Sequence, residues 1–254
     1  MTPNLLILGG TMEATALARA VAEAGIAGVV SFAGRVERPV RQPLPQRVGG
    51  FGGAGGLAEY LRAEKITHVV DATHPFAAQM SANAISACSM AEVPLIALTR
   101  APWEAQPGDN WTHVPDISGA VAALNRPALR VMLAVGRMHL ADFAPNPQHF
   151  YLLRLVDPPK AALPLPRTQV LVSRGPFTLA DDQALMEAHD IDLVVSKNAG
   201  GTGAYAKIEA ARTLGLPVIM IDRPAIPNRP EAHEVAQVLA WLDHSASFAT
   251  ERGV

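Results

Sequence analysis

Short apolar runs alternate with amphipathic segments along most of the chain. The first run, residues 4–8, is NLLIL, and the segment 12–23 that follows places Leu17 and Val21 on one helical face. Gly25 then interrupts the helical pattern, as glycine does at the carboxyl end of many helices. The chain therefore begins with a predicted strand and a predicted helix.

The alternation continues to the end of the chain. Further predicted strands occupy residues 28–33, 67–72, 95–98, 130–135, 170–172, 192–195 and 218–221. Further predicted helices occupy residues 76–91, 178–189, 203–214 and 231–243. Strands that alternate with helices of about 10–15 residues indicate βαβ units, and therefore an α/β fold with mostly parallel sheets.

Two segments of the chain resemble each other. Residues 68–102 and 192–224 both run from a strand through a polar loop and a helix to an X-Pro step, a second strand and an arginine. The repeat predicts two similar halves, residues 1–125 and 126–244, each with a parallel sheet flanked by helices, and then a loose tail at 245–254. The alternative is that any two βαβ units look somewhat alike.

The composition is that of a globular protein. Hydrophobic residues make up 49% of the chain and charged residues 17%, so a large core can form. A net charge of −2 offers no basic surface for nucleic acid, and the single Cys88 excludes an internal disulfide and a cysteine-based zinc site. Polar residues interrupt the uncharged stretch 75–91, which indicates a buried helix and no membrane span. The start of the chain lacks the pattern of a signal peptide, so we expect a cytoplasmic protein.

Arginine outnumbers lysine by 17 to 4. Base composition of the coding genome is the simplest explanation of such a bias. The functional alternative is anion recognition, since a guanidinium group binds carboxylates and phosphates through two parallel hydrogen bonds. The excess by itself does not decide between the two.

Two short motifs follow the first two predicted strands. Gly9, Gly10 and Thr11 connect a strand to a helix, where backbone N–H groups can bind a phosphate. A purely structural turn is an equal alternative, because the full G-x-G-x-x-G pattern is absent. After the second strand, Ser31 and Arg35 stand in a segment without an acid, which favours the 2′-phosphate of NADP over the free ribose of NAD.

A dense run of glycines and several missing motifs limit the chemistry. Residues 49–56 hold six glycines, which indicates a flexible or closely packed loop, with a mobile cover over a site as one option. No Gly-Lys dipeptide occurs, so a P-loop is excluded. The patterns Tyr-x-x-x-Lys, G-x-S-x-G and H-E-x-x-H are also absent, and no histidines are spaced as metal ligands. We therefore expect no metal.

Two polar loops end predicted strands, one in each half. In the loop 71–77 (DATHPFA), Pro75 holds His74 extended, where the histidine could act in catalysis, contact a ligand or cap the next helix. The loop 196–204 (SKNAGGTGA) combines Lys197 with an amide and three glycines before a helix, a combination that suits an anion.

Five blocks together resemble the precorrin-6A reductase family of cobalamin biosynthesis. They are ILGGTxEA at 7–14, SxAGR at 31–35, DATHPFA at 71–77, SKNAGG at 196–201 and the segment 207–223, so the resemblance spans about residues 4–243. It implies two Rossmann-like halves with the active site in the cleft between them. It also implies NADPH-dependent reduction of one carbon–carbon double bond in a methylated, ring-contracted tetrapyrrole that carries many carboxylates.

The resemblance also implies roles for single residues. The predicted cofactor-binding residues lie in the first half: Gly9, Gly10, Thr11, Glu13, Ser31, Gly34, Arg35, Thr73, Pro75 and Phe76. The predicted substrate-binding residues lie in the second half: Asn198, Gly200, Gly201, Thr202, Lys207 and Arg223. Lys197 and His74 are the candidate catalytic residues, as donors of a proton, with water as the alternative donor.

Two other functions stay open at this point. A non-catalytic NADP-sensing regulatory protein would bind NADP through the first half, and the loop around Lys197 would then have no function in binding or catalysis. In a tetrapyrrole carrier, the Gly-Gly-Thr turn would be structural only. As partners we expect the precorrin substrate and neighbouring enzymes of its pathway, and neither nucleic acid nor a membrane.

Overall fold

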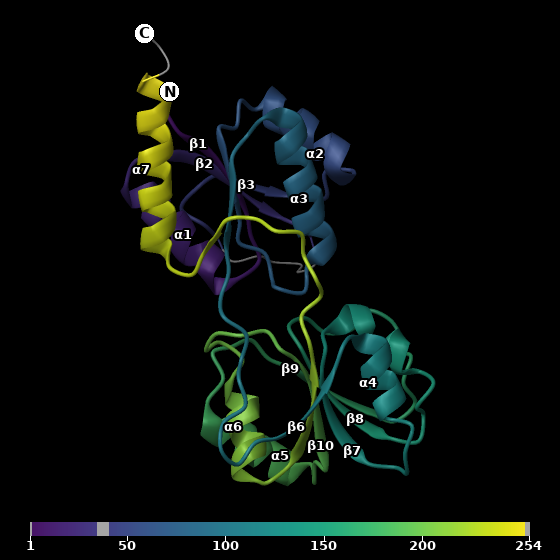
Figure 1. Ribbon diagram of the computed structural model, residues 1–254. Coiled ribbons are helices and arrows are strands. Elements are labelled where there is room, and N and C mark those ends of the chain that lie inside the picture. Colours follow the sequence, from purple (N-terminus) through teal and green to yellow (C-terminus); the bar gives the residue numbers. More distant parts are fainter. Residues whose placement is uncertain (1, 35–40, 252–254) are drawn as a thin grey trace. The chain divides into compact units, whose positions relative to one another are not determined.

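Two parallel β-sheets, each of six strands, organise the part of the chain that the structure describes, residues 2–34 and 41–251 (Figure 1). The contacts within this computed structural model divide the chain into two units. Unit 1 consists of Met1–Arg100 and Ala225–Val254, and unit 2 consists of Ala101–Pro224. The predicted fold class, α/β with two parallel sheets flanked by helices, is thereby confirmed.

The sheet of unit 1 has the strand order β3-β2-β1-β4-β5-β12, the order of doubly wound nucleotide-binding folds. Its strands are β1 (Asn4–Leu8), β2 (Ala27–Phe32), β3 (Gln46–Val48), β4 (His68–Asp71), β5 (Leu95–Leu98) and β12 (Glu231–Ala232). The helices of the unit are α1 (Met12–Glu23), α2 (Gly53–Ala63), α3 (Ala78–Ala91) and α7 (Val235–Glu251).

Strand β1 shows how both faces of this sheet are covered. Leu5 and Ile7 pack into a cluster with residues of α1 and α7, while Leu6 and Leu8 pack with residues of α2 and α3. All four side chains are between 0% and 2% exposed. A strand buried on both faces is apolar at every position, which is why the run NLLIL predicts it so clearly.

Unit 2 repeats this arrangement with the strand order β9-β8-β7-β10-β11-β6. Its strands are β6 (Asn110–Val114), β7 (Arg130–Ala134), β8 (Phe150–Leu155), β9 (Thr168–Val172), β10 (Leu193–Lys197) and β11 (Pro217–Ile221). Its α-helices are α4 (Ile117–Ala123), α5 (Leu179–Ala188) and α6 (Ala206–Thr213), and short 3-10 turns lie at Arg137–His139 and Ala141–Phe143. Residues of α5 and α6 bury one face of the sheet, in a cluster with Leu152, Val194 and Val218.

Each unit takes its sixth strand from the other half of the sequence. β6 and α4 follow β5 in the chain, yet β6 pairs with β11 at the edge of the unit 2 sheet. β12 and α7 follow β11, yet β12 pairs with β5 in unit 1. The predicted boundary at residues 125/126 is therefore corrected. The units divide at residues 100/101 and 224/225, so β6 and α4 belong to unit 2, and β12 and α7 belong to unit 1.

Two local predictions also need correction. The glycine-rich stretch 49–56 is a loop only at its start, because α2 begins at Gly53. The tail expected from residue 245 is helical through Glu251 as the end of α7. Neither α7 nor any other helix in the described ranges combines the length and the apolar character needed to cross a membrane.

Candidate functional site

The predicted cofactor residues that the structure describes lie at the edge of unit 1 where the parallel strands end. Ligands bind at this edge in open α/β sheets. Gly10 has a φ of 124°, and an added Cβ atom would meet nothing within 4 Å, so its main chain borders open space. The Thr11 hydroxyl accepts a hydrogen bond from the Ala14 N–H (3.1 Å) and donates one to the Ala72 carbonyl (2.8 Å). The turn ties β1 to the end of β4 and presents the start of α1, a feature that binds phosphate.

Glu13 is engaged by a cation of the same unit. Both of its carboxylate oxygens accept hydrogen bonds from Nη1 of Arg100 at 2.8 Å. Burial opposes the ionisation of Glu13, but the hydrogen bonds and the charge of Arg100 outweigh burial and hold the pKa of Glu13 below its ordinary value of 4.5. The pair borders a narrow depression that is also lined by Thr11, Thr73, Pro75, Leu98 and Thr99. Glu13 therefore fixes Arg100 at the rim of this depression, a task that the sequence did not indicate.

Asp71, the last residue of β4, anchors the loop that carries His74. Its Oδ1 accepts hydrogen bonds from the Thr73 N–H (3.1 Å) and the Thr73 hydroxyl (2.7 Å). Its Oδ2 accepts one from the Ser81 hydroxyl (2.6 Å) and forms an ion pair with Arg229. With its side chain 1% exposed and four donors around it, Asp71 holds the loop in one conformation.

His74 lies in this loop in a defined hydrogen-bonding state. Its Nδ1 accepts a hydrogen bond from the Phe76 N–H at 3.2 Å, and the two rings lie 5.8 Å apart. A neutral imidazole that accepts at Nδ1 carries its proton on Nε2. Pro75 is buried, while Thr73, His74 and Phe76 are partly exposed. The Phe76 contact therefore sets the tautomer of a neutral His74, whose ring is partly exposed.

Arg47 is a residue of this edge that sequence reasoning missed. Strand β3 pairs with β2 so that Arg47 is the register partner of Ser31. Its Nη1 donates hydrogen bonds to the Ser31 hydroxyl (2.7 Å) and the Gly49 carbonyl (3.1 Å), and its guanidinium carbon lies 3.8 Å from the centre of the Phe51 ring. These contacts fix a cation at the end of β2. Arg35, the cation predicted there, lies outside the described residues.

Two glycines lie near Ser31: Gly9 follows the neighbouring strand β1, and Gly34 lies in the segment that follows β2. The Gly9 N–H donates a hydrogen bond to the Ser31 carbonyl (2.9 Å), which joins the ends of β1 and β2. Gly34 has a φ of 75°, in the region that favours glycine. Ser31 itself is 5% exposed, and its hydroxyl accepts the hydrogen bond from Arg47 in a largely buried position.

In unit 2, the loop after β10 is fastened by its own predicted site residues. Both amide atoms of Asn198 bind the main chain of Trp103. Arg223 donates hydrogen bonds to the carbonyls of Asn198 (3.0 Å) and Ala199 (3.1 Å). At Gly200, with a φ of 69°, an added Cβ would lie 2.2 Å from the Ala101 carbonyl oxygen, so only glycine fits. These hydrogen bonds of Asn198 and Arg223 build the loop, and the substrate-binding role predicted for both residues and for Gly200 stays a prediction.

The other predicted residues of this loop occupy different environments. Lys197 ends β10 and is partly exposed, and Thr202 is exposed. The Gly201 carbonyl accepts a hydrogen bond from Nε1 of Trp103 (2.7 Å). Lys207 lies in the first turn of α6 and is 7% exposed. The binding and catalytic roles predicted for these residues stay predictions.

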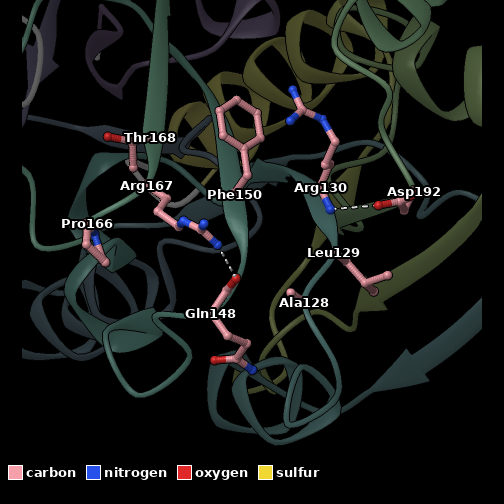
Figure 2. A pocket seen from close by; sticks show the side chains of 9 residues that line it. All are labelled: Ala128, Leu129, Arg130, Gln148, Phe150, Pro166, Arg167, Thr168 and Asp192. Carbon is pink, nitrogen blue, oxygen red and sulfur yellow. Dashed lines mark hydrogen bonds between the residues drawn. The ribbon is translucent and has the colours of Figure 1, made fainter.

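A surface hollow in unit 2 lies at the opposite edge of the sheet, where β7, β8 and β9 begin. Figure 2 shows its lining, in which the Arg130 N–H donates to Asp192 (2.7 Å) and Nη1 of Arg167 donates to the Gln148 carbonyl (3.2 Å). Ligands of parallel sheets bind at the carboxyl ends of the strands, so we do not take this hollow as the site.

Within the described ranges, no group of three or more His, Cys, Asp or Glu side chains could hold a metal ion.

Similarity to known proteins extends over both units. The profile of the family described as "Precorrin-6x reductase CbiJ/CobK" matches residues 4–243. The precorrin-6A reductase of Rhodobacter capsulatus is 57% identical over 99% of both chains, and that of Rhodococcus erythropolis is 46% identical over 94% of this chain and 97% of the relative. A solved structure of CobK precorrin-6A reductase, 57% identical, has a TM-score of 0.92 and covers 95% of this chain and 96% of that chain. Because the family match spans nearly the whole sequence and both sheets, this chain belongs to the precorrin-6x reductase family.

Proposed function

We propose that this chain catalyses the NADPH-dependent reduction of one double bond of precorrin-6A in cobalamin biosynthesis. The observation that carries the proposal is the 57% identity with a relative named precorrin-6A reductase, over 99% of both chains. The resemblance seen in five sequence blocks supports the same reaction. Two doubly wound sheets, each with polar loops at the carboxyl ends of its strands, supply the binding surfaces that this reaction needs.

The residues of unit 1 fit a dinucleotide. The open space beside Gly10 and the start of α1 at Thr11 would hold the pyrophosphate. Ser31 and Arg47 at the end of β2 would hold the 2′-phosphate that distinguishes NADPH from NADH, and no acid stands between residues 29 and 36 to bind a free ribose. Arg35 stays a second candidate for that phosphate. Thr73, Pro75 and Phe76 complete the proposed cofactor set.

When bound, NADPH supplies a hydride to an electrophilic carbon of the macrocycle. The chain's own residues orient the reactants and govern the proton that the neighbouring carbon takes up. We infer that Lys197 at the end of β10 or His74 donates this proton, with water as the alternative. His74 would donate as the imidazolium, after its Nδ1 has released the Phe76 N–H and taken up a proton. Gly201, Thr202 and Lys207 are proposed to bind carboxylate arms of the substrate.

The direct test is to mix purified protein with NADPH and precorrin-6A. We expect oxidation of NADPH, followed by its absorbance, and a product whose mass has increased by two hydrogen atoms. Binding of NADPH without oxidation would favour the NADP-sensing regulatory protein, and binding of the tetrapyrrole without NADPH would favour a carrier. His74→Asn and Lys197→Ala, assayed for kcat at several pH values, identify which side chain governs the proton.

The cellular setting is part of the proposal. We propose a cytoplasmic location and contact with neighbouring enzymes of the pathway, both as expected from the resemblance. Cell fractionation tests the first, and co-purification of this chain with the enzymes that make and consume its tetrapyrroles tests the second.

A further inference from the structure

A buried group of charges lies where β8 and β10 end in unit 2. Arg154 is the second-last residue of β8, and Asp182 lies in the first turn of α5. The two form an ion pair in which the Asp182 side chain is 1% exposed and the Arg154 side chain 14% exposed. The ring of Phe177 covers one side of the guanidinium, whose carbon lies 4.1 Å from the ring centre. The charges of this pair balance each other.

Lys207 brings a second cation to the same group. It is 7% exposed and lies 5.0 Å from the centre of the Trp103 ring. Within the described ranges, one hydrogen-bond acceptor is found for its three N–H donors, the Ala204 carbonyl at 2.6 Å. Burial lowers the pKa of Lys207 to about 8; the charge of Asp182 opposes this shift and the charge of Arg154 adds to it. Among the residues that the structure describes, this group holds two cations and one anion, so one buried positive charge has no counter-ion there.

An isolated buried charge is costly, and proteins normally pair it. The ion pair between Arg154 and Asp182 already links β8 to α5, so the fold does not need Lys207 for that link. One more carboxylate would balance the charge and accept the unused N–H groups. The position is suitable for a ligand, because it lies at the edge of the sheet where the parallel strands end.

We propose that Arg154 and Lys207 form a binding site for one carboxylate group of the tetrapyrrole substrate. The partly exposed side of Arg154 admits the carboxylate, Lys207 supplies the second cation, and Asp182 holds Arg154 in place. The inference rests on the proposed function, and it adds Arg154, a residue that neither the sequence motifs nor the family resemblance indicated.

The test compares wild type with Lys207→Met, Lys207→Arg and the exposed-lysine control Lys65→Met. Absorbance titration with precorrin-6A gives the Kd of the tetrapyrrole, and fluorescence titration gives the Kd of NADPH. Loss of a charge-assisted hydrogen bond is expected to weaken tetrapyrrole binding about 10- to 100-fold in Lys207→Met. Lys207→Arg recovers most of the affinity, and all variants bind NADPH like wild type.

Proton uptake separates a ligand contact from a merely structural lysine. A bound carboxylate favours the protonated form of Lys207, so wild type takes up a proton on binding near pH 8.5, measured by calorimetry in buffers of different ionisation enthalpy. Lys207→Met takes up less. Unchanged tetrapyrrole affinity and unchanged proton uptake in a folded Lys207→Met variant would overturn the carboxylate site alone. Failure of wild type to bind or reduce the tetrapyrrole would overturn the proposed function, and this site with it.

Discussion

Asn198 holds the main chain of Trp103 through both atoms of its side-chain amide. Oδ1 accepts a hydrogen bond from the Trp103 N–H at 2.7 Å, and Nδ2 donates one to the Trp103 carbonyl at 2.9 Å. The two residues are 95 positions apart in sequence, and the contact is buried. It fixes the segment before β6 against the loop after β10, and the second bond of Trp103, from Nε1 to the Gly201 carbonyl, completes the attachment.

Replacing Asn198 by aspartate tests this attachment. A carboxylate keeps the acceptor for the Trp103 N–H but replaces the donor with an oxygen that faces the Trp103 carbonyl. We expect Asn198→Asp to lower the free energy of unfolding by about 1–3 kcal/mol, measured by urea denaturation. The exposed Asn125→Asp is the matched control and should change stability by less than about 0.5 kcal/mol. Equal stability of the two variants would contradict the structural role.

The pair of Glu13 and Arg100 predicts a pH-dependent contribution to stability. The pKa of Glu13 is lower in the folded state than its ordinary 4.5, so its contribution is complete above pH 4.5 and is lost as the pH falls through the folded value. Because both side chains are partly exposed, we expect Glu13→Gln to cost about 1 kcal/mol at pH 7. The difference from wild type, measured by denaturation at several pH values, should shrink below pH 4.5. A difference that stays constant down to pH 3 would argue against an ionised pair.

Much of the fold is predictable from the sequence because buried parallel strands leave a local signal. The run NLLIL is apolar at each buried position of β1, and the loops after β4 and β10 stand out because polar residues follow apolar runs directly. β8 carries a comparable run, FYLLRL, which the sequence reading overlooked. Short elements leave little signal: β3 has three residues and β12 has two.

The exchange of β6 and β12 between units was beyond sequence reasoning for a different reason. A repeat shows that two halves are alike, but it does not indicate to which of the two sheets each edge strand is hydrogen-bonded. That assignment follows from the hydrogen bonds that β6 makes with β11 and β12 makes with β5 in the folded protein. The same holds for side chains at the sites: Arg47 meets Ser31, and Arg154 meets Asp182, only because strands or helices distant in sequence become neighbours.

Arg47 should set the preference for NADPH over NADH. Its guanidinium is held by Ser31 and stacked on Phe51 where the 2′-phosphate is proposed to bind. Arg47→Ala is expected to weaken NADPH binding roughly 10- to 100-fold and to leave NADH binding nearly unchanged, measured by fluorescence titration of both cofactors. Arg47→Lys should fall between them, since lysine keeps the charge without the planar fork. Exposed Arg19→Ala serves as the control, and an unchanged ratio of the two affinities in Arg47→Ala would assign the phosphate elsewhere.

Activity should not require an added metal ion. The sequence has one cysteine and no histidines at metal-ligand spacing, so the predicted reaction needs only NADPH and the tetrapyrrole. We expect the rate of NADPH oxidation to be unchanged after dialysis against excess EDTA. Loss of the rate, with recovery on adding one particular divalent metal, would contradict this expectation.

Lys207 should make the protein less stable at neutral pH than the same fold without its charge. Burial lowers the pKa of Lys207 from its ordinary 10.5 to about 8, so the unfolded chain binds this proton more tightly than the folded protein does. One pKa unit corresponds to about 1.4 kcal/mol, and methionine forgoes the hydrogen bond to Ala204, so Lys207→Met is expected to raise the free energy of unfolding by about 2–3 kcal/mol at pH 7. The gain should decrease between pH 8 and pH 10.5, where the folded protein releases the proton first, and become small above that range. Denaturation at several pH values measures this difference in the free energy of unfolding, and the exposed Lys65→Met is the control. A Lys207→Met variant that is less stable than wild type at every pH would show that the buried charge does not destabilise the folded protein.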